Sequence, residues 1–370
     1  MEKPLIFLIL LLVIQGYFAY RLRARAKISR LLFLFSATLF FLLIIEFGYR
    51  LFFRTKKINS TINSYFRYDS LMGYKFKDTG KLKAVEYFSG GDTIYNTFYT
   101  VLNDTIHNQY NYPFRKGYRN DSNRRETVFL GCSVTMGECL PDEETLPCQY
   151  GKLSGISAVN RGYNGFGVHQ VYQLFKFKYA NQDNHNRVFV YTFLLDHLIR
   201  ANGLYTWNMA GPYFEVSGDS LVFKGPSFQF HKIKGLSLAY YASFFGAFTF
   251  IRNNIEKIAL DWSIRKLSAK DLSREYLMIK KMAERINATG GRLVILNWDS
   301  NATRNKISEV LSQDSVTNCI SNAISPSGGK VLPVSAVINF SDKKYFVPKD
   351  GHPSALAYSV LADYLIRNLQ

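Results

Sequence analysis

The sequence predicts an α/β fold with a doubly wound, largely parallel sheet over residues 126–370. Short apolar runs alternate there with helical stretches, which is the rhythm of strand, loop and helix in such sheets. One run, 187–195, is almost continuously apolar, as strands covered on both faces of a parallel sheet are. The loops at the carboxyl ends of the strands are therefore expected to carry the functional site.

Residues 1–57 predict a membrane anchor of two helices. The runs 4–20 and 31–49 are nearly all apolar, and each has about the ~20 residues that a bilayer core requires. The loop between them, 21–30, has five positive charges and no acid, which indicates a cytoplasmic loop. The rest of the chain then lies outside the cytoplasmic membrane. A cleaved signal peptide is the alternative for the first run, but no small-x-small cleavage site follows it.

The net charge of +18 is unevenly distributed. Residues 1–57 contain ten basic and two acidic residues, and the remainder has a net charge of +10. This milder bias could favour an anionic substrate or the membrane surface, although a solvated basic surface explains it equally simply. No basic run with interleaved aromatic residues indicates a nucleic-acid partner.

The four cysteines form no Cys-x-x-Cys pair, so no zinc site is predicted. Cys139 and Cys148 are close enough in sequence to form a disulfide if the compartment is oxidising. Spacing alone does not decide that question.

Residues 58–125 predict a small β-rich lead-in that packs against the main domain. The segment is polar and rich in glycine turns, and it contains short β-like runs such as 93–101. It shows no catalytic constellation.

Five stretches of the main domain, 126–370, predict strands, because each is a short apolar run. In chain order the strands are 128–130, 157–160, 187–195, 292–297 and 331–337. Helices are predicted at 168–179, 275–288, 304–311 and 354–368.

An insertion at about 204–251 interrupts this order. It contains a predicted hairpin, 213–223, and an apolar, aromatic stretch, 236–251, that predicts a helix. That helix either packs in the core or lies on the membrane.

The first candidate catalytic residue is Ser133. The strand 128–130 ends at Gly131, Ser133 follows two residues later, and Gly137 closes a short predicted helix. A serine there exposes its hydroxyl at the carboxyl end of a strand, where free helix N–H groups could stabilise an oxyanion. The alternative is an ordinary Gly-x-Ser turn.

The second motif, Asp350-Gly351-His352-Pro353, precedes the final predicted helix. A histidine preceded by a carboxylate can act as a general base with its orienting acid. Alone, the motif is also a plausible helix-entry turn. Together with Ser133 it predicts a nucleophile, a base and an acid that meet at one edge of the sheet.

These motifs resemble the sequence blocks of the SGNH (GDSL-like) hydrolases. The stretch Leu130-Gly-Cys-Ser-Val-Thr-Met-Gly137 is similar to the first block of that family, Leu-Gly-Asp-Ser-x-Thr-x-Gly. The four matching stretches are 129–138 with 141–147, 159–165, 190–196 and 350–355.

The resemblance implies a three-layer α/β/α fold of flavodoxin type and ester hydrolysis or acyl transfer through an acyl-serine. It implies that Ser133 is the nucleophile, His352 the base and Asp350 its partner. The N–H groups of Ser133 and Gly165 would donate to the oxyanion. No cofactor or metal is expected.

Three features depart from the family pattern. Cys132 replaces the acid before the serine, either as a second possible nucleophile or, more simply, as a small buried thiol. Leu195 stands where the family has an asparagine that donates to the oxyanion, a bond that can be worth ~3 kcal/mol. Its loss implies a slower enzyme, none of the usual chemistry, or a replacement donor, for which the candidates are Asn164, Thr192 and His197. Asp350 precedes His352 by two residues where many members have three, a spacing that related acetyltransferase-like branches share.

The end of the third strand carries Asp196, His197 and Arg200. They predict either a substrate-binding cluster, with Arg200 for an anionic or sugar ligand, or an ion pair between Asp196 and Arg200 that caps the loop.

Two functions are consistent with these patterns. The first is a membrane-anchored esterase or O-acyltransferase that acts outside the membrane on acylated carbohydrate or a lipid-linked glycan. The second is a non-catalytic relative that binds glycans in an envelope assembly complex, which Cys132 and Leu195 favour.

Overall fold

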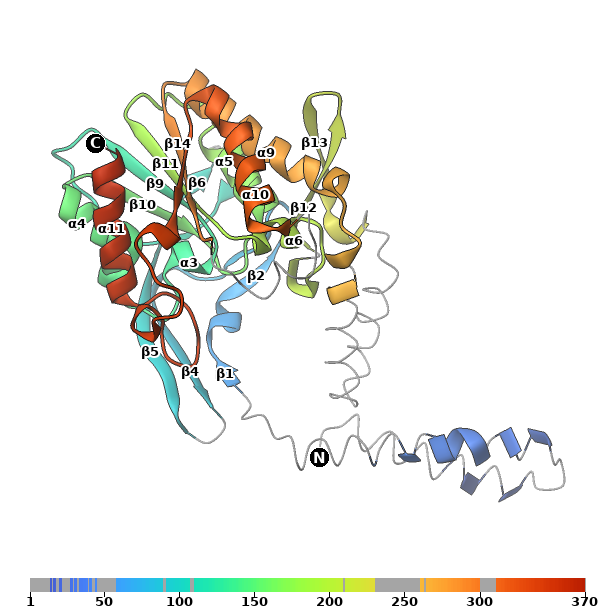
Figure 1. The fold of residues 1–370 in the computed structure, drawn as a ribbon. Helices are drawn as coiled ribbons and strands as arrows, with labels where there is room; N and C mark the ends of the chain where they lie inside the picture. Colours follow the sequence, from blue (N-terminus) through green and yellow to red (C-terminus); the bar gives the residue numbers. More distant parts are fainter. Residues whose placement is uncertain are drawn as a thin grey trace. The chain divides into compact units, whose positions relative to one another are not determined.

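The computed structural model describes most of the chain after residue 57 (Figure 1). The described residues are 58–88, 91–106, 110–208, 210–229, 260–262, 264–299 and 311–369, with scattered helical positions between 14 and 44. The chain divides into two compact units, Met1–Lys57 with Ile233–Ser263 and Ile58–Lys232 with Ile264–Gln370. All that follows concerns the second unit.

Within the described residues, no helix combines the length and the apolar character that a membrane crossing requires. The predicted span 4–20 falls mostly on residues outside the described ones, the span 31–49 does so in part, and the candidate helix 236–251 falls entirely outside them.

A five-stranded, fully parallel sheet forms the centre of this unit. Its spatial order is β10-β9-β11-β14-β15, which is the order 2-1-3-4-5 of doubly wound sheets. The strands are β9 (Glu126–Gly131), β10 (Ser157–Gly162), β11 (Arg187–Phe193), β14 (Arg292–Asn297) and β15 (Lys330–Pro333). The predicted parallel α/β sheet is therefore confirmed.

Helices cover both faces of the sheet, so the unit has three layers. Figure 1 shows α4 (Leu146–Ser154) and α11 (Ala355–Leu369) on one side of the strands, where they pack together. The other side carries α5 (Val168–Lys178), α9 (Ala269–Ala288) and α10 (Gln313–Ile324). Because helices lie on both sides, β9 and β11 are buried along nearly their whole length, which explains their continuous apolar runs.

Some elements differ from the predictions, and one prediction falls largely outside the described residues. The last strand ends at Pro333 and continues as a 3₁₀ turn, η8 (Val334–Ala336), rather than to residue 337. The predicted helix 304–311 lies outside the described residues except for its last position. Neither α4 nor α10 was predicted.

The segment before the main sheet is built of strands. A four-stranded antiparallel sheet has the order β1-β4-β5-β8, and β2-β3 and β6-β7 are two-stranded. The strands are β1 (Ile58–Ser60), β2 (Phe66–Asp69), β3 (Gly73–Phe76), β4 (Gly80–Phe88), β5 (Thr93–Leu102), β6 (Thr105–Ile106), β7 (Tyr110–Asn111) and β8 (Phe114–Arg115).

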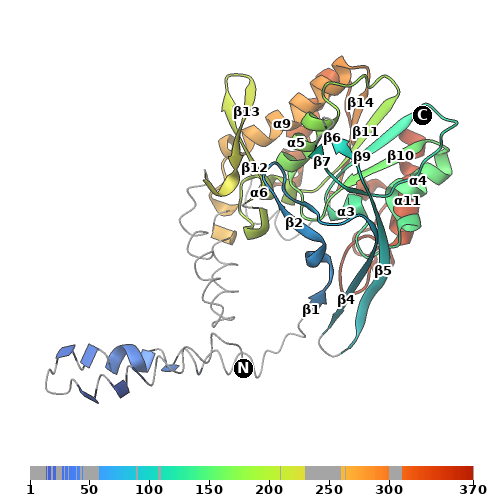
Figure 2. The same ribbon diagram turned by 180° about the vertical axis from the view of Figure 1, so that it is seen from behind.

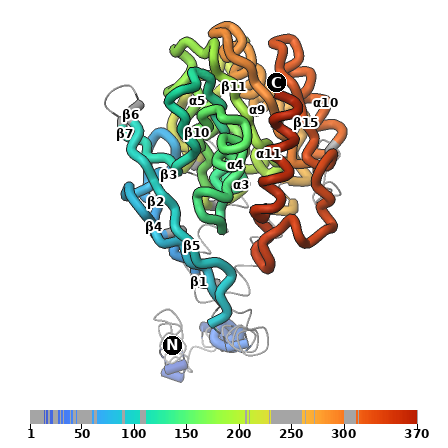
Figure 3. Tube along the Cα trace, turned by 90° about the vertical axis from the view of Figure 1, so that its left-hand side faces the viewer, coloured from blue at the N-terminus to red at the C-terminus, as the bar shows by residue number. Residues whose placement is uncertain are grey.

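This β-rich segment packs against the main sheet near the start of α3 (Ser133–Met136). Strand β8 contacts β10, and Tyr118 forms an antiparallel bridge with Ala158 of β10. Figures 2 and 3 show the long hairpin of β4 and β5, and the N–H of Thr100 in β5 donates to Asp142, in the loop after α3, at 3.0 Å. The lead-in therefore reaches the carboxyl edge of the sheet, where the candidate site lies.

The insertion after β11 begins with α6 (Asp196–Ala201) and a 3₁₀ turn, η3 (Thr206–Asn208). The antiparallel hairpin of β12 (Pro212–Ser217) and β13 (Ser220–Pro226) follows, as the sequence predicts.

Candidate active site

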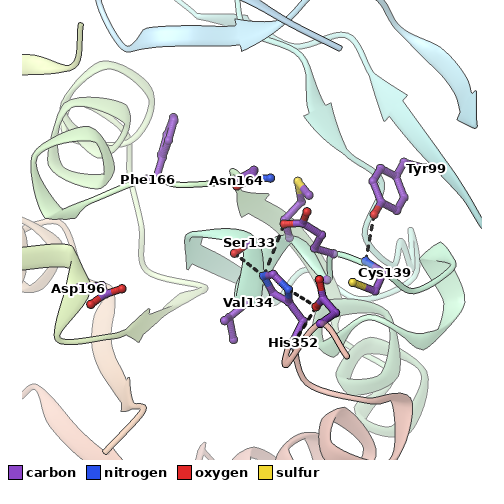
Figure 4. Close-up of polar contacts among 12 residues, drawn as sticks. Tyr99, Ser133, Val134, Cys139, Asn164, Phe166, Asp196 and His352 are labelled. Carbon is purple, nitrogen blue, oxygen red and sulfur yellow. Dashed lines mark hydrogen bonds and ion pairs between the residues drawn. The ribbon is translucent and has the colours of Figure 1, made fainter. Parts of the chain in front are cut away.

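Ser133, His352 and Asp350 lie in one hydrogen-bonded row (Figure 4). Ser133 is the first residue of α3, and its Oγ is 2.8 Å from Nε2 of His352. Nδ1 of His352 is 2.5 Å from Oδ1 of Asp350, which also accepts the backbone N–H of His352 at 2.9 Å. Two donors of His352 thus converge on one carboxylate oxygen and fix the orientation of the ring.

The local sequence explains why Ser133 is held at the end of β9. Gly131 has φ +149°, and a Cβ there would lie 2.2 Å from Oγ1 of Thr135. Thr135 uses that hydroxyl to donate to the carbonyl of Leu130 at 3.1 Å, which closes the turn between strand and helix. Only glycine permits this backbone and this approach.

The final helix secures the same turn from the other side. The hydroxyl of Tyr358, in α11, donates to the carbonyl of Val134 at 2.6 Å. The helix that follows His352 therefore binds directly to the helix that begins with Ser133, so the distance between base and nucleophile is set by packing.

The electrostatics suit a base and its orienting acid. Burial lowers the pKa of His352, but the hydrogen bond to Asp350 and the charges of Glu138 and Asp350 outweigh it, so the pKa is raised. Burial also opposes ionisation of Asp350, yet its bonds to His352 bring its pKa down to about 2. Asp350 is therefore an anion at neutral pH and favours the imidazolium that forms during proton transfer.

A second carboxyl group, Glu138, lies on the nucleophile side of the imidazole. Its Oε2 is 3.5 Å from Nε2 of His352, the same nitrogen that meets Ser133. Glu138 is buried, and burial is the main reason why its pKa is raised. Its position directly after Gly137 of the first motif was the signal that could have identified it.

Cys139 lies on the far side of Asp350. Its thiol hydrogen-bonds to that carboxylate, and its N–H donates to the Tyr99 hydroxyl at 3.0 Å. Cys139, Asp350 and His352 are also close enough to form a potential metal-binding group. Burial raises the pKa of the Cys139 thiol well above its usual range, which favours a hydrogen-bond donor over the thiolate that a metal requires. Cys139 and Cys148 are free, so the disulfide considered from the sequence is not formed.

The β-rich lead-in, in which the sequence shows no catalytic constellation, contributes side chains that lie beside the site. Tyr74 of β3 donates its hydroxyl to the carbonyl of Asn164 at 2.5 Å. Glu86 of β4 lies near Asp350 and Glu138, and burial together with these two charges raises its pKa to about 7. No local sequence pattern marks these residues, because each is an ordinary strand position.

Arg115 of β8 is the principal support of the loop that carries Glu138 and Cys139. Its side chain is fully buried and pairs with Asp142 at 2.9 Å. Its remaining N–H groups donate to the carbonyls of residues 136, 137 and 140 at 2.6–2.9 Å. The ring of Tyr99 lies 3.9 Å from the guanidinium. One buried cation thus binds three carbonyls of the loop, although the Met136 carbonyl also accepts from Asn160 and the Gly137 carbonyl from the N–H of Leu140.

The predicted oxyanion donors belong to two adjoining turns. Gly165 has φ +72° in the loop between β10 and α5, and Arg200 donates to the carbonyl of Phe166 in that loop at 2.8 Å. Within the described residues, the N–H groups of Ser133 and Gly165 meet no protein acceptor. Their role as donors to an oxyanion stays a prediction.

The three candidate replacements for the missing asparagine donor differ in position. Asn164 is half-buried and directly precedes Gly165 in the loop between β10 and α5. Thr192 and His197 are fully buried, and Nδ1 of His197 is paired with the Tyr191 hydroxyl at 2.8 Å. Of the three side chains, only that of Asn164 is partly exposed, so it stays the candidate for the replacement donor.

The burial of His197 also counts against its expected role in substrate binding. Its ring packs between aromatic residues of β11, parallel to Tyr191 and edge-on to Phe193, and burial lowers its pKa well below the usual value. A neutral, enclosed imidazole is a core residue rather than a substrate ligand.

Asp196 and Arg200 lie together, with Nη2 of Arg200 3.9 Å from Oδ2 of Asp196. The side chain of Asp196 is partly accessible, with an exposure of 29%, whereas that of Arg200 is 11% exposed. Arg200 also hydrogen-bonds to the thiol of Cys132, which is fully buried. The ion pair considered from the sequence is present, and Cys132 has the position of a buried thiol rather than of an exposed nucleophile.

No family model matches the sequence, and no curated protein matches it. Several solved structures resemble it weakly. A member of the lipolytic protein G-D-S-L family from Veillonella parvula DSM 2008 is 11% identical, with a TM-score of 0.38, over 66% of this chain and 97% of that one. A GDSL-like lipase from Bacteroides thetaiotaomicron VPI-5482 is 12% identical, with a TM-score of 0.36, over 68% and 91%. A carbohydrate esterase family 2 enzyme with a carbohydrate binding domain from Corynascus thermopiles is 11% identical, with a TM-score of 0.37, over 85% and 99%. Similarities this slight establish neither family nor activity.

Proposed function

We propose that this protein is a membrane-anchored serine esterase or O-acyltransferase of SGNH (GDSL-like) type, acting on ester-linked acyl groups of envelope carbohydrate or glycolipid. The observation that carries the proposal is the unbroken row from Ser133 Oγ through both imidazole nitrogens of His352 to Asp350. A serine at the carboxyl edge of a parallel sheet, bonded to a histidine that is bonded to an ionised carboxylate, is the arrangement of an acyl-transfer nucleophile.

In the first half of the proposed reaction, Oγ of Ser133 attacks the ester carbonyl while Nε2 of His352 takes its proton. The carbonyl oxygen becomes an oxyanion and accepts from the N–H groups of Ser133 and Gly165. The C–O bond to the alcohol then breaks, and His352 returns the proton to the leaving alkoxide. An acyl-Ser133 ester and a free sugar hydroxyl result.

In the second half, His352 removes a proton from water or from a second hydroxyl, and that oxygen attacks the acyl-serine. Water gives a carboxylic acid and therefore hydrolysis, whereas a second sugar hydroxyl gives transfer. In both cases His352 returns the proton to Oγ of Ser133. Glu138, near the same nitrogen, favours the charged imidazolium between these steps.

The substrate class and the location rest on sequence features. Two apolar runs around the basic loop 21–30 favour an anchor with the catalytic unit outside the cytoplasmic membrane. An enzyme held there meets envelope glycans and lipid-linked sugars during their assembly. Reporter fusions after residue 57 test this topology, because a reporter that is active only when exported should be active there. Activity of a cytoplasmic reporter at the same position would reverse the assignment.

The decisive experiment is the intact mass of the full-length protein, purified in detergent, after incubation with an activated acyl ester. Wild type should gain one acyl group, and Ser133→Ala should gain none. The matched control is Ser217→Ala, which changes an exposed serine of β12 and should acylate like wild type. An adduct that persists in Ser133→Ala would contradict the assignment of the nucleophile.

A non-catalytic glycan-binding role is the second candidate. It is favoured by Leu195, which leaves the site without the third oxyanion donor that the resemblance implies. In that case glycan binding would be unaffected by Ser133→Ala, and esters with a range of acyl chain lengths would not be turned over.

A further inference from the structure

Trp207, in the 3₁₀ turn after α6, is a half-exposed indole beside the glycine that is proposed to bind the oxyanion. Its exposed fraction is 51%, although tryptophan is highly buried on average. A Cβ built on Gly165 would lie 3.1 Å from Nε1 and 3.3 Å from Cδ1 of Trp207. The pyrrole edge of the indole therefore borders Gly165, and the rest of the ring extends from that edge.

One face of this indole is covered. The ring of Tyr205 stacks on it with a centroid distance of 4.2 Å and an interplanar angle of 27°. Tyr205 is itself buried, with 7% exposure, so it serves as a backing for Trp207. Since Tyr205 covers one face, a ligand that stacks on the indole must use the opposite face.

The turn that holds the indole is fixed by buried hydrogen bonds. Asn208 is fully buried, and its Nδ2 donates to Oε1 of Gln170 at 3.0 Å. The same Gln170 oxygen accepts from the N–H of Gly167, in the loop that carries Gly165, at 3.0 Å. The position of the indole is therefore coupled to the oxyanion loop, and little ordering is required when a ligand binds.

Polar groups lie at the edge of this aromatic surface. The Tyr205 hydroxyl is 3.5 Å from Oδ2 of Asp196. Asp196 is the first residue of α6, and its side chain is partly accessible, with an exposure of 29%. A flat aromatic face with a carboxylate at its rim suits a ligand that is apolar on its face and carries hydroxyl groups at its edge. A pyranose ring has this character. A long acyl chain would instead require an enclosed apolar channel.

We propose that Trp207, backed by Tyr205, is the platform on which the sugar ring of an O-acylated pyranoside stacks, with Asp196 accepting a sugar hydroxyl. This inference rests on the proposed function and specifies which part of the substrate lies on which side of Ser133. In this arrangement the sugar ring stacks on Trp207, in the insertion after β11. The ester group of the sugar points towards Ser133 and Gly165.

Binding without turnover tests the platform independently of catalysis. In a Ser133→Ala background, the affinity for an O-acetylated methyl pyranoside is measured by calorimetry. A further Trp207→Ala change should weaken binding by about tenfold or more, which corresponds to ~1.4 kcal/mol, and Trp207→Phe should restore part of it. The matched control is Leu153→Ala, which removes an exposed apolar side chain from α4 in the same compact unit and should not affect binding.

Turnover supplies the second readout. The ratio of kcat/KM for the acetylated pyranoside to kcat/KM for ethyl acetate should fall about tenfold in Trp207→Ala. An equal loss for both esters would overturn the inference, because it would mean that the indole only supports the Gly165 loop. Unchanged pyranoside affinity in Trp207→Ala would overturn it as well. Loss of affinity in a protein that turns over no ester would support the platform while contradicting the proposed catalysis.

Discussion

Replacing Asp350 by asparagine removes the charge behind His352 while keeping the shape of the side chain. Two donors of His352, its N–H and Nδ1, converge on Oδ1 of Asp350, so an asparagine can present its carbonyl oxygen to both. The tautomer that leaves Nε2 free to accept from Ser133 is then retained. What the variant loses is the attraction between a carboxylate and the imidazolium.

The size of this loss follows from the geometry. The bonded atoms are 2.5 Å apart. The centres of the two charges are therefore roughly 4 Å apart, where an effective dielectric constant of ~20 gives about 4 kcal/mol. Since ~1.4 kcal/mol corresponds to a factor of ten, kcat/KM should fall by roughly 10³-fold.

The pH dependence gives an independent check. His352 must be neutral to act as a base, so activity rises with pH through its pKa. Asp350 is one of the causes that raise this pKa. In Asp350→Asn the rising limb should therefore move to lower pH while its plateau falls.

The assay is the pH–rate profile of acetyl ester hydrolysis by the full-length protein, with Ser133→Ala as the background rate. Circular dichroism verifies that the variant is folded. A plateau within tenfold of wild type, or a rising limb that does not move in a folded variant, would refute Asp350 as the partner of His352.

Three further changes test other parts of the site. Gly165→Ala should cost about 1–3 kcal/mol of folding free energy and lower kcat by about 10²-fold, because it strains the loop of a proposed oxyanion donor. Gly218→Ala, at φ +59° in an open turn, is the matched control in thermal unfolding and activity assays, and it should retain activity. Glu138→Gln should shift the rising limb of the pH–rate profile to lower pH, since the charge of Glu138 raises the pKa of His352; an unmoved limb would contradict this. Arg115→Met should lower the free energy of unfolding by about 3–5 kcal/mol, measured with denaturant, because it leaves a buried carboxylate unpaired; a loss under ~1 kcal/mol would show that the loop carbonyls find other partners.

The strands of the main sheet were predictable because strands that are buried on both faces consist of consecutive apolar residues. Strand β11 has apolar side chains on both faces, and only a strand between two helical layers requires that. Helix α10 illustrates the opposite case. Its sequence is rich in serine, threonine and asparagine, which are weak helix formers, and packing on α9 supplies what local propensity does not.

The residues of the candidate site also fall into two groups, those that the sequence predicts and those that only the packing brings together. Ser133 and the Asp350–His352 pair were predictable because each belongs to a compact motif at the end of a strand or the start of a helix. Tyr74 was not, because its contact with Asn164 joins residues 90 positions apart and depends on how the lead-in packs. The sequence indicates Trp207 only weakly, because it is one of several aromatic residues in the insertion that follows β11.

The separation of nucleophile and base along the chain has a consequence for biosynthesis. Ser133 and His352 are 219 residues apart, and the ring is fixed only when α11 docks and Tyr358 reaches Val134. A nascent chain therefore carries its serine for most of the synthesis of this unit without a base to activate it. Reactivity of Ser133 towards an acylating probe should appear only after α11 has docked. The rate at which that reactivity appears during folding would therefore measure the rate of this last step.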